Sequence, residues 1–226
     1  MTQPVARLHP VEDRTLRAQV HQRILDMVLS GRVAPGAKLT EPSLAEQLQV
    51  SRAPLREALR ELVDQGILVS QPYKGLRVRP VSRTDLKELY SMRSALEKFA
   101  FTLTWPLRDA AAFADLDGRY DQLMATRKIG DQARAIEREI AFHSWVYDTS
   151  GHGLLQRHWA RLSSLVRIYM SLHHNLHGAH GVFGAMTTEY WSLAQGADLD
   201  RMLGHIDDHM AQGFDSVVKT LPDAEE

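Results

Sequence analysis

The run Val50-Ser51-Arg52-Ala53-Pro54-Leu55-Arg56-Glu57-Ala58-Leu59 places apolar and basic side chains on different faces of one short predicted helix. Apolar residues recur at the spacing of a single helical face, at Leu55, Ala58, Leu59 and Leu62. Basic residues recur every fourth position on another face, at Arg52, Arg56 and Arg60. Ser51 is predicted to cap the helix, Pro54 is tolerated in its first turn, and Gly66 is predicted to end it. We therefore expect a helix that is anchored by its apolar face and exposes a stripe of arginines.

Short elements on both sides of this helix complete a small predicted domain over residues 16–80. Helical and strand periodicities predict four further elements, the last two as a β-hairpin, at 16–28, 41–49, 67–69 and 76–79. Short helices followed by a hairpin are the layout of a winged helix-turn-helix. Residues 1–15 have no apolar periodicity and are predicted to form a mobile arm.

Residues 82–221 are predicted to form an all-helical domain. Ser82 can cap its first helix, with Asp85 in the first turn. That helix carries an apolar stripe that a lone helix would expose to water, at Leu86, Leu89, Met92, Leu96, Phe99, Ala100 and Leu103. Periodicity predicts about six helical segments, at 82–104, 109–126, 131–149, 153–176, 182–196 and 198–219. We therefore expect a mainly α protein with an N-terminal winged helix-turn-helix and a C-terminal helical bundle.

The composition is that of a globular protein with an uneven distribution of charge. The chain has 226 residues, 44% of them hydrophobic, which is enough for two ordinary domains. No apolar stretch approaches the roughly 20 residues that span a bilayer, so we expect a cytoplasmic protein without a membrane partner. The absence of cysteine excludes disulfides, thiolate metal sites and cysteine nucleophiles. Residues 1–82 contain 12 Lys and Arg against 8 Asp and Glu, although the net charge is −1, so a nucleic-acid partner is expected at this end.

Arginine suits the exposed face of the quoted helix if that face binds DNA. Its planar guanidinium group can pair with guanine or with a phosphate, whereas lysine offers only a point charge. Ser51 and the N-terminus of the helix could hold a phosphate. The alternative is a solvated face in which Arg56 and Arg60 pair with Glu57 or Glu61.

The same residues resemble the DNA-binding domain of the GntR family of bacterial regulators. The resemblance rests on six pieces of sequence, at 35–41, 44–46, 50–59, Leu62, 66–68 and Gly75. It implies that Arg52 and Arg56 contact operator bases or phosphates, and that the wing tip Lys74-Gly75 enters the minor groove. We expect residues that bind double-stranded operator DNA at Ser51, Arg52, Arg56, Arg60, Lys74 and Gly75.

The C-terminal part resembles the FadR branch of that family, whose helical effector domain is called FCD. The resemblance rests on four pieces of sequence, at 92–97, 139–143, Asp198 and His209. It implies one divalent metal, zinc or nickel, that coordinates a small carboxylate effector. The sequence departs from the family pattern twice, because Glu139 stands where Asp is usual and no histidine occurs near Thr187 or Thr188.

Residue spacing supports a metal site in part. Glu139 and His143 are four apart on one helical face and could chelate a cation together with His209 from another helix. His205, one turn before His209, could supply a fourth ligand. The alternatives are a solvated pair for Glu139 and His143, and a buried histidine without a metal for His209.

Arg93 lies among apolar neighbours on the first helix of the predicted bundle. It forms either a buried ion pair with a carboxylate side chain or the group that receives an acidic effector. The expected effector-binding residues are Arg93, Glu139, His143 and His209.

Together these patterns predict a ligand-responsive transcription regulator that binds a palindromic operator as a homodimer paired through its C-terminal bundles. Because most members of the family that the chain resembles are repressors, we expect a repressor of a metabolic operon, released by its effector, and not an enzyme. One alternative is a metal-dependent enzyme with a DNA-binding appendage, although the stretch from His205 to His209 lacks the Glu that a zincin uses as base. Another is an architectural DNA protein without an effector.

Overall fold

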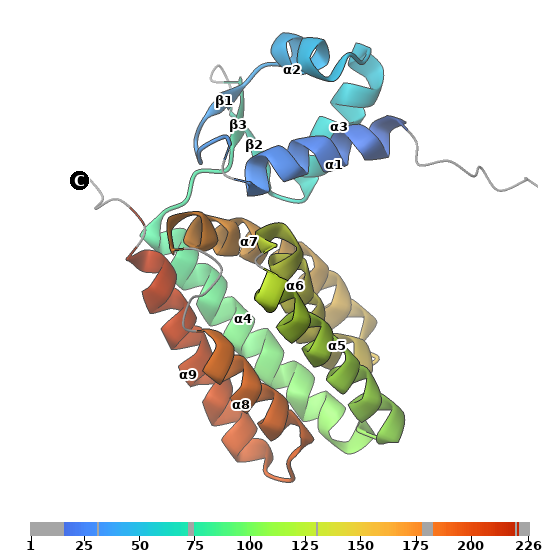
Figure 1. Cartoon of the computed structure of the whole chain (residues 1–226), viewed down its shortest axis with the longest axis vertical. Coiled ribbons are helices and arrows are strands. Elements are labelled where there is room, and N and C mark those ends of the chain that lie inside the picture. The colour runs from blue at the N-terminus through green and yellow to red at the C-terminus, as the bar shows by residue number, and fades with distance from the viewer. Residues whose placement is uncertain are drawn as a thin grey trace, which may run out of the picture.

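The computed structural model describes residues 16–30, 32–71, 75–129, 131–177, 183–219 and 221, without the side chains of 127–129, 132, 133, 172–177, 183 and 184. The predicted arm at 1–15 and the predicted wing-tip residue Lys74 lie outside these described residues. The N-terminal region forms a small helical domain with a sheet, and the remainder forms a helical bundle (Figure 1). The prediction of a mainly α protein with these two parts is confirmed.

The N-terminal region has three helices and a three-stranded sheet among its described residues. Its elements are α1 (Leu16–Leu29), β1 (Lys38–Leu39), α2 (Glu41–Leu48), α3 (Arg52–Asp64), β2 (Leu68–Gln71) and β3 (Gly75–Val78). The strands are antiparallel in the order β1-β3-β2, with Lys38 opposite Arg77 and Leu68 opposite Val78. The hairpin therefore forms the wing, and β1 adds a strand that the sequence did not predict, because two residues are too short to show alternation.

The apolar face of α3 is the centre of the N-terminal core, as the sequence predicted. Leu55, Ala58, Leu59 and Leu62 are all buried. Gly66 follows α3 with φ of 75°, a left-handed conformation that suits a glycine after a helix end. The backbone N–H of Ile67 donates to the carbonyl oxygen of Leu62, so Ile67 belongs to the end of the helix. Strand β2 begins at Leu68, one residue later than the sequence predicted.

Six α-helices form the C-terminal bundle in the part of the chain that is described. They are α4 (Arg83–Thr104), α5 (Ala110–Ile129), α6 (Gln132–Thr149), α7 (Gly153–His177), α8 (Phe183–Gln195) and α9 (Leu199–Val218), with a 3-10 turn η1 (Trp105–Leu107) after α4. Ser82 caps α4 as predicted, because its hydroxyl accepts from the Asp85 N–H and the Asp85 carboxylate accepts from the Ser82 N–H. No helix of the described residues is long and apolar enough to cross a membrane.

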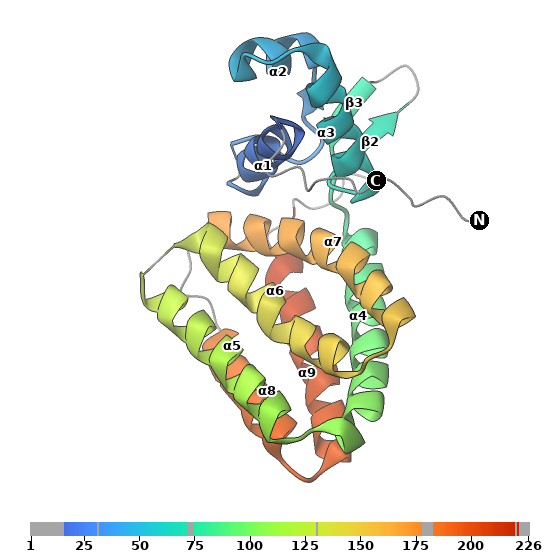
Figure 2. The ribbon, with the colours of Figure 1, turned by 90° about the vertical axis from the view of Figure 1, so that its right-hand side faces the viewer.

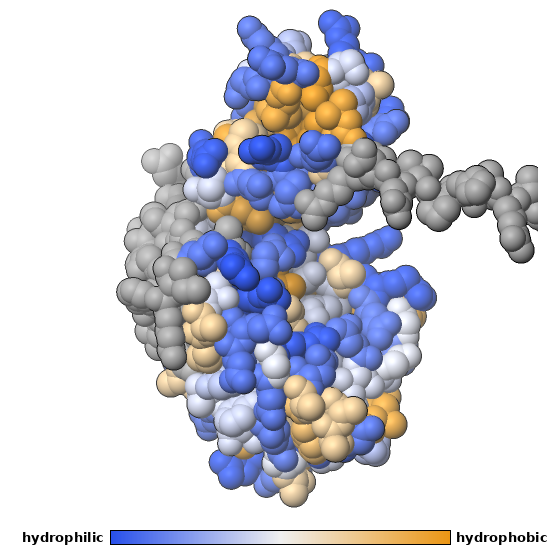
Figure 3. Space-filling view, turned by 45° about the vertical axis from the view of Figure 1, so that its right-hand side comes forward, coloured by the Kyte–Doolittle hydropathy of each residue, from blue (hydrophilic) through white to orange (hydrophobic). Residues whose placement is uncertain are grey.

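Helix α7 packs along the underside of the N-terminal region, next to α1 (Figures 1 and 2). Ile168 of α7 is 3% exposed and belongs to the hydrophobic core of the N-terminal region. The Ser171 hydroxyl donates to the Leu29 carbonyl oxygen at the end of α1. On the side shown in Figure 3 the bundle is mostly hydrophilic, consistent with burial of its apolar side chains inside. The two regions thus share a packed boundary.

Candidate functional site

The exposed face of α3 carries the predicted arginine stripe. Arg52, Arg56 and Arg60 are all exposed, on a face of the helix next to the one that buries the leucines. The Arg56 Nε donates to a Glu41 carboxylate oxygen at 2.8 Å, and its side chain remains 55% exposed. The expected alternative pairing of Arg56 with Glu57 or Glu61 is not what the structure shows, because Glu41 at the start of α2 lies closer. The three arginines are therefore accessible, and Arg56 is held in place by Glu41 of the neighbouring helix.

Ser51 occupies the N-cap position of α3 but accepts no capping hydrogen bond, contrary to the expectation that its side chain caps the helix. The second strand of the wing begins at Gly75, whose φ of 78° is a left-handed conformation that favours glycine. A surface hollow of about 540 Å³ is lined by residues of both α3 and the wing, among them Arg56, Arg60 and Gly75. The stripe and the wing therefore border one concave surface.

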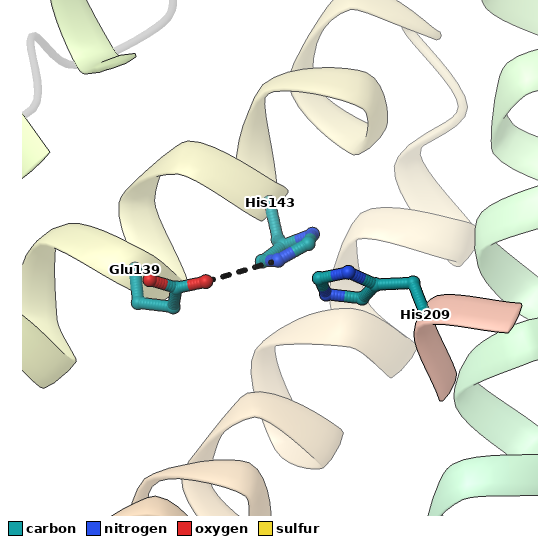
Figure 4. Close-up of side chains that lie close together, drawn as sticks. All are labelled: Glu139, His143 and His209. Carbon is teal, nitrogen blue, oxygen red and sulfur yellow. Dashed lines mark ion pairs between the residues drawn. The ribbon is translucent and has the colours of Figure 1, made fainter. Parts of the chain in front are cut away.

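A second group of predicted residues meets inside the bundle. Glu139 and His143 of α6 and His209 of α9 each offer a ligand atom, and these atoms lie within 4.8 Å of one another (Figure 4). A Glu139 carboxylate oxygen lies 3.5 Å from His143 Nε2, and the two imidazole rings are 5.2 Å apart between centroids. All three residues are buried. The alternative of a solvated Glu139–His143 pair is therefore wrong.

The electrostatics of this cluster fit a divalent metal. Burial, together with the charges of His143 and Arg93, lowers the pKa of His209 to about 3, which keeps its imidazole neutral, the form that binds a metal. His143 Nε2 and His209 Nδ1 are buried without a hydrogen-bond partner among the described residues. Buried polar atoms normally have one, so two imidazole nitrogens and a carboxylate form a donor set suited to zinc or nickel.

The fourth proposed ligand, His205, lies outside the cluster. Its Nε2 is 3.2 Å from the Met186 carbonyl oxygen, and its Nδ1 is 3.7 Å from a Glu189 carboxylate oxygen. Thr188, at the position where the family pattern led us to expect a histidine, has its hydroxyl 2.9 Å from that of Tyr120. The structure thus brings together three of the four predicted ligands.

Arg93 satisfies the first of its two expected roles and retains capacity for the second. Its Nε donates to a Glu97 carboxylate oxygen at 3.2 Å, one helical turn further along α4. Its Nη2 is buried and has no hydrogen-bond partner among the described residues. The guanidinium lies 5.7 Å from the ring centroid of Trp159. Arg93 is therefore ion-paired and still holds one unused donor group.

Glu97 connects Arg93 with the histidine cluster, and the sequence did not identify it as a site residue. One of its carboxylate oxygens lies 2.9 Å from His143 Nδ1 and accepts from the Tyr190 hydroxyl at 2.7 Å. Burial opposes ionisation of Glu97, but His143, Arg93 and these hydrogen bonds outweigh it and lower its pKa to about 2. An ionised carboxylate can only accept, so Nδ1 of His143 donates to Glu97. The other ring nitrogen of His143, Nε2, is then the one on the side of Glu139 and His209. The i,i+4 spacing from Arg93 could have revealed Glu97, whereas nothing in the sequence identifies Tyr190.

A winged helix-turn-helix joined to a helical domain with a buried polar site defines a DNA-binding transcription regulator. Residues 16–78 match the family model described as bacterial regulatory proteins, gntR family, and residues 88–211 match the FCD domain. The chain belongs to the GntR family of transcription regulators, in its FCD-containing branch. The alternative of an enzyme with a DNA-binding appendage is therefore excluded.

Individual relatives agree with this assignment. The chain is 31% identical over 158 residues to the probable D-xylose utilization operon transcriptional repressor of Paenarthrobacter nicotinovorans, covering 70% of each protein. It is 25% identical over 145 residues to the gluconate operon transcriptional repressor of Bacillus subtilis, covering 64% of this chain and 59% of that protein. The fold is similar to that of Escherichia coli McbR/YncC, with a TM-score of 0.74 and 22% identity over 91% of this chain and 98% of that structure.

Proposed function

We propose that this regulator represses an operon and is released from its operator by a small carboxylate effector. The observation that carries the proposal is the buried cluster of Glu139, His143 and His209 beside Arg93, inside a domain that packs against the DNA-binding region. Two of the relatives described above are named as repressors of sugar or sugar-acid operons, which supports the sign of control. The chemistry of the site supports an acidic effector, because its unused donor belongs to an arginine.

On the DNA side, we assign base or phosphate contacts to Arg52, Arg56 and Arg60, and a phosphate contact to Ser51. The exposed side chains on α3 and the Ser51 hydroxyl, which makes no capping bond, support this assignment. The wing residues Lys74 and Gly75 would approach the minor groove. Pairing of two chains through residues 82–221 would place two α3 helices on the half-sites of a palindrome.

On the effector side, Glu139, His143 and His209 would hold a divalent zinc or nickel ion. The ion would supply a Lewis-acidic position for a carboxylate oxygen of the effector. Glu97 orients His143, and Arg93 offers a positive charge and one free N–H group to the acid. An acid can shift the regulator away from DNA only by binding more tightly to the released conformation. The DNA-bound conformation must therefore bind the acid more weakly.

Binding of the protein to the DNA upstream of its own gene tests the DNA-binding assignment. We expect Arg56→Ala to weaken specific binding by about 1–3 kcal/mol, because a guanidinium contact to a base edge is lost. The measurement is a titration by fluorescence anisotropy on the specific sequence and on random DNA of equal length. Glu41→Gln, which frees Arg56 without removing it, is the matched control. Equal losses of affinity for both DNAs would mean that Arg56 contacts a phosphate and not a base. The absence of any specific binding by the wild type would refute the proposed repressor.

The melting temperature of chelator-stripped protein tests the metal site. We expect zinc or nickel to raise it in a concentration-dependent manner, because a ligand that binds only the folded state stabilises that state. His143→Ala should abolish the rise. His205→Ala is the control and should retain it, because His205 lies outside the cluster. A wild-type protein that shows no rise would rule out the metal while leaving an acid site at Arg93.

A further inference from the structure

A pocket that the proposed function does not use lies where the end of α3 meets α4 and α7. Its volume is about 430 Å³, and no residue of the histidine cluster lines it. Its lining residues come from the end of α3 and from Arg79 in the N-terminal part, and from α4 and α7 in the bundle. Figure 2 shows α7 and the start of α4 beneath the N-terminal region. The pocket therefore spans the boundary between the DNA-binding region and the bundle.

Four apolar side chains line this pocket without being fully buried. Met92 of α4 is 53% exposed, although large apolar side chains are normally covered. Leu96, Leu162 and Leu165 pack against the core of the bundle but are only half-buried. Apolar side chains that gather at a partly open surface often mark a place where another segment or molecule binds. The pocket is therefore a candidate docking surface.

Charged side chains of the pocket favour an occupant that carries acidic groups. Arg161 and His158 of α7 are exposed and have no ion-pair partner among the described residues. Arg79 uses its Nε to donate to the Gly66 carbonyl oxygen at 2.7 Å. Asp64 adds a single carboxylate to the lining that is described. An occupant that combines apolar side chains with more acids than bases would therefore complement the pocket.

The chain itself contains such a segment in residues 1–15, which precede α1. This segment has three apolar residues followed by a charged run, at Val5, Leu8, Val11 and Glu12-Asp13-Arg14. The two acids of the run complement the cations of the pocket, and its arginine complements Asp64. The composition of the segment thus matches the lining in both apolar and charged groups.

The start of α1 lies close enough to the pocket for this segment to reach it. The Arg17 Nη1 lies 3.4 Å from a Glu61 carboxylate oxygen, and the His21 Nε2 lies 3.0 Å from Gln65 Oε1. Gln65 itself lines the pocket, and Leu16, the first residue of α1, precedes His21 by about 7 Å of helix. Fifteen extended residues can span up to about 50 Å. The segment therefore begins near the pocket and is long enough to cross it.

We propose that residues 1–15 dock in the pocket between α3, α4 and α7 and tie the DNA-binding region to the bundle. The apolar side chains of the segment cover those of α4 and α7, and its acids pair with Arg161 and His158. The docked segment adds a second tie between the two regions, beside the direct contact of α7 with the N-terminal core. This inference goes beyond the proposed function, because it concerns neither the operator nor the effector.

Disulfide cross-linking of the full chain gives the first test, because the wild type has no cysteine that would compete. Val5→Cys, Leu8→Cys and Val11→Cys are each combined with Met92→Cys, and the rate of cross-linking under mild oxidation is followed by non-reducing electrophoresis. Leu107→Cys replaces Met92→Cys in the control, since both side chains are 53% exposed but Leu107 follows the far end of α4. We expect at least one Met92→Cys pair to cross-link within one chain at least about tenfold faster than its control, because docking raises the local concentration of the thiol.

Two results of this experiment would overturn the docking. Equal rates with Met92→Cys and Leu107→Cys in all three positions would show that the segment has no preference for the pocket. Cross-links between chains, recognised by twice the mass of one chain, with none inside a chain would show that a second copy covers the pocket instead. Because the test uses neither DNA nor an effector, its failure leaves the proposed repressor unaffected, and failure to bind an operator leaves the docking unaffected.

Charge reversal in the fastest cross-linking pair gives the second test. Arg161→Glu should slow the cross-link by about twofold to fivefold, the size expected for one exposed ion pair. Addition of Glu12→Arg to Arg161→Glu should restore the rate. Arg157→Glu is the matched control, because Arg157 is exposed on the same helix but does not line the pocket, and it should leave the rate unchanged. Equal slowing by both arginine variants, or no recovery with Glu12→Arg, would overturn the proposed pairing of the segment with α7.

Discussion

Glu97 shows at the scale of one residue how a buried charge organises the polar cluster inside the bundle. It is 0% exposed, yet it remains ionised because Arg93, His143 and Tyr190 all contact its carboxylate. Taking a carboxylate out of water is costly unless such partners are present. Replacement of Glu97 should therefore affect both the stability of the bundle and the orientation of His143.

We expect Glu97→Gln to lower the free energy of unfolding of stripped protein by about 3 kcal/mol at pH 7, because it leaves Arg93 buried without its counter-ion. The pKa of Glu97 is lowered from 4.5 to about 2, so its ionised form stabilises the fold above pH 4.5 and loses that effect as the pH falls toward 2. The difference between wild type and variant should therefore shrink below pH 4.5. Denaturant unfolding from pH 7 to pH 3 measures it.

Glu137→Gln is the control for this pH series. Its carboxylate pairs with Arg167 but its side chain is 50% exposed, so we expect a change of less than about 1 kcal/mol. If the difference in the free energy of unfolding between wild type and Glu97→Gln stayed constant with pH, Glu97 would not be ionised in the folded protein.

At the scale of elements, one glycine of α9 allows a close approach to α4. A Cβ added at Gly213 of α9 would lie 2.7 Å from Cε1 of Tyr90, a rigid ring on α4 that also packs edge-on against Phe214. These helices carry Arg93, Glu97 and His209, so the contact between them holds these residues near one another.

We expect Gly213→Ala to lower the free energy of unfolding by about 1–2 kcal/mol, because the steric cost exceeds the gain in helix propensity. Gly204→Ala in the same helix is the control, since nothing lies within 4 Å of the added Cβ, and it should stabilise by about 0.5–1 kcal/mol. Chemical denaturation of both variants measures the difference. Stabilisation by Gly213→Ala would show that the two helices can separate without cost.

At the scale of the whole molecule, α7 belongs to both regions. Its Trp159 lies beside Arg93, while Ile168 completes the core of the DNA-binding region and Leu165 comes within 3.3 Å of a Cβ placed at Gly66. A rearrangement around Arg93 that moves α7 would therefore reach the end of α3 directly. All four tryptophans, at 105, 145, 159 and 191, lie in the helical bundle, so their fluorescence reports that region alone.

We expect Ile168→Ala to destabilise the DNA-binding region by about 2–5 kcal/mol, because it opens a cavity in that core. Thermal unfolding followed by far-ultraviolet circular dichroism should begin at a lower temperature, while the tryptophan fluorescence transition should stay nearly unchanged. Ile206→Ala, in the core of the bundle, should shift the fluorescence transition instead. Coincident shifts of both signals in Ile168→Ala would mean that the two regions unfold as one unit.

Much of the fold could be predicted because the necessary patterns are local. The apolar face of α3, the arginine stripe, the Ser82–Asp85 cap and the six helices of the bundle all follow from spacings within one element, and the structure places their ends within one helical turn of the prediction. The strand β1 was missed because two residues carry no period. Ser51 was predicted to cap α3 by its type, but its side chain makes no such bond.

The candidate site was predicted in composition but not in arrangement. The sequence determined which helices carry Arg93, Glu139, His143 and His209, since their positions on a helical face depend only on neighbouring residues. Only the tertiary structure decided that Glu97 joins them, that Arg56 pairs with Glu41 and that His205 lies apart. The physical reason is that ion pairs and shared burial depend on how distant helices cross, which is a property of packing and not of any single stretch of sequence.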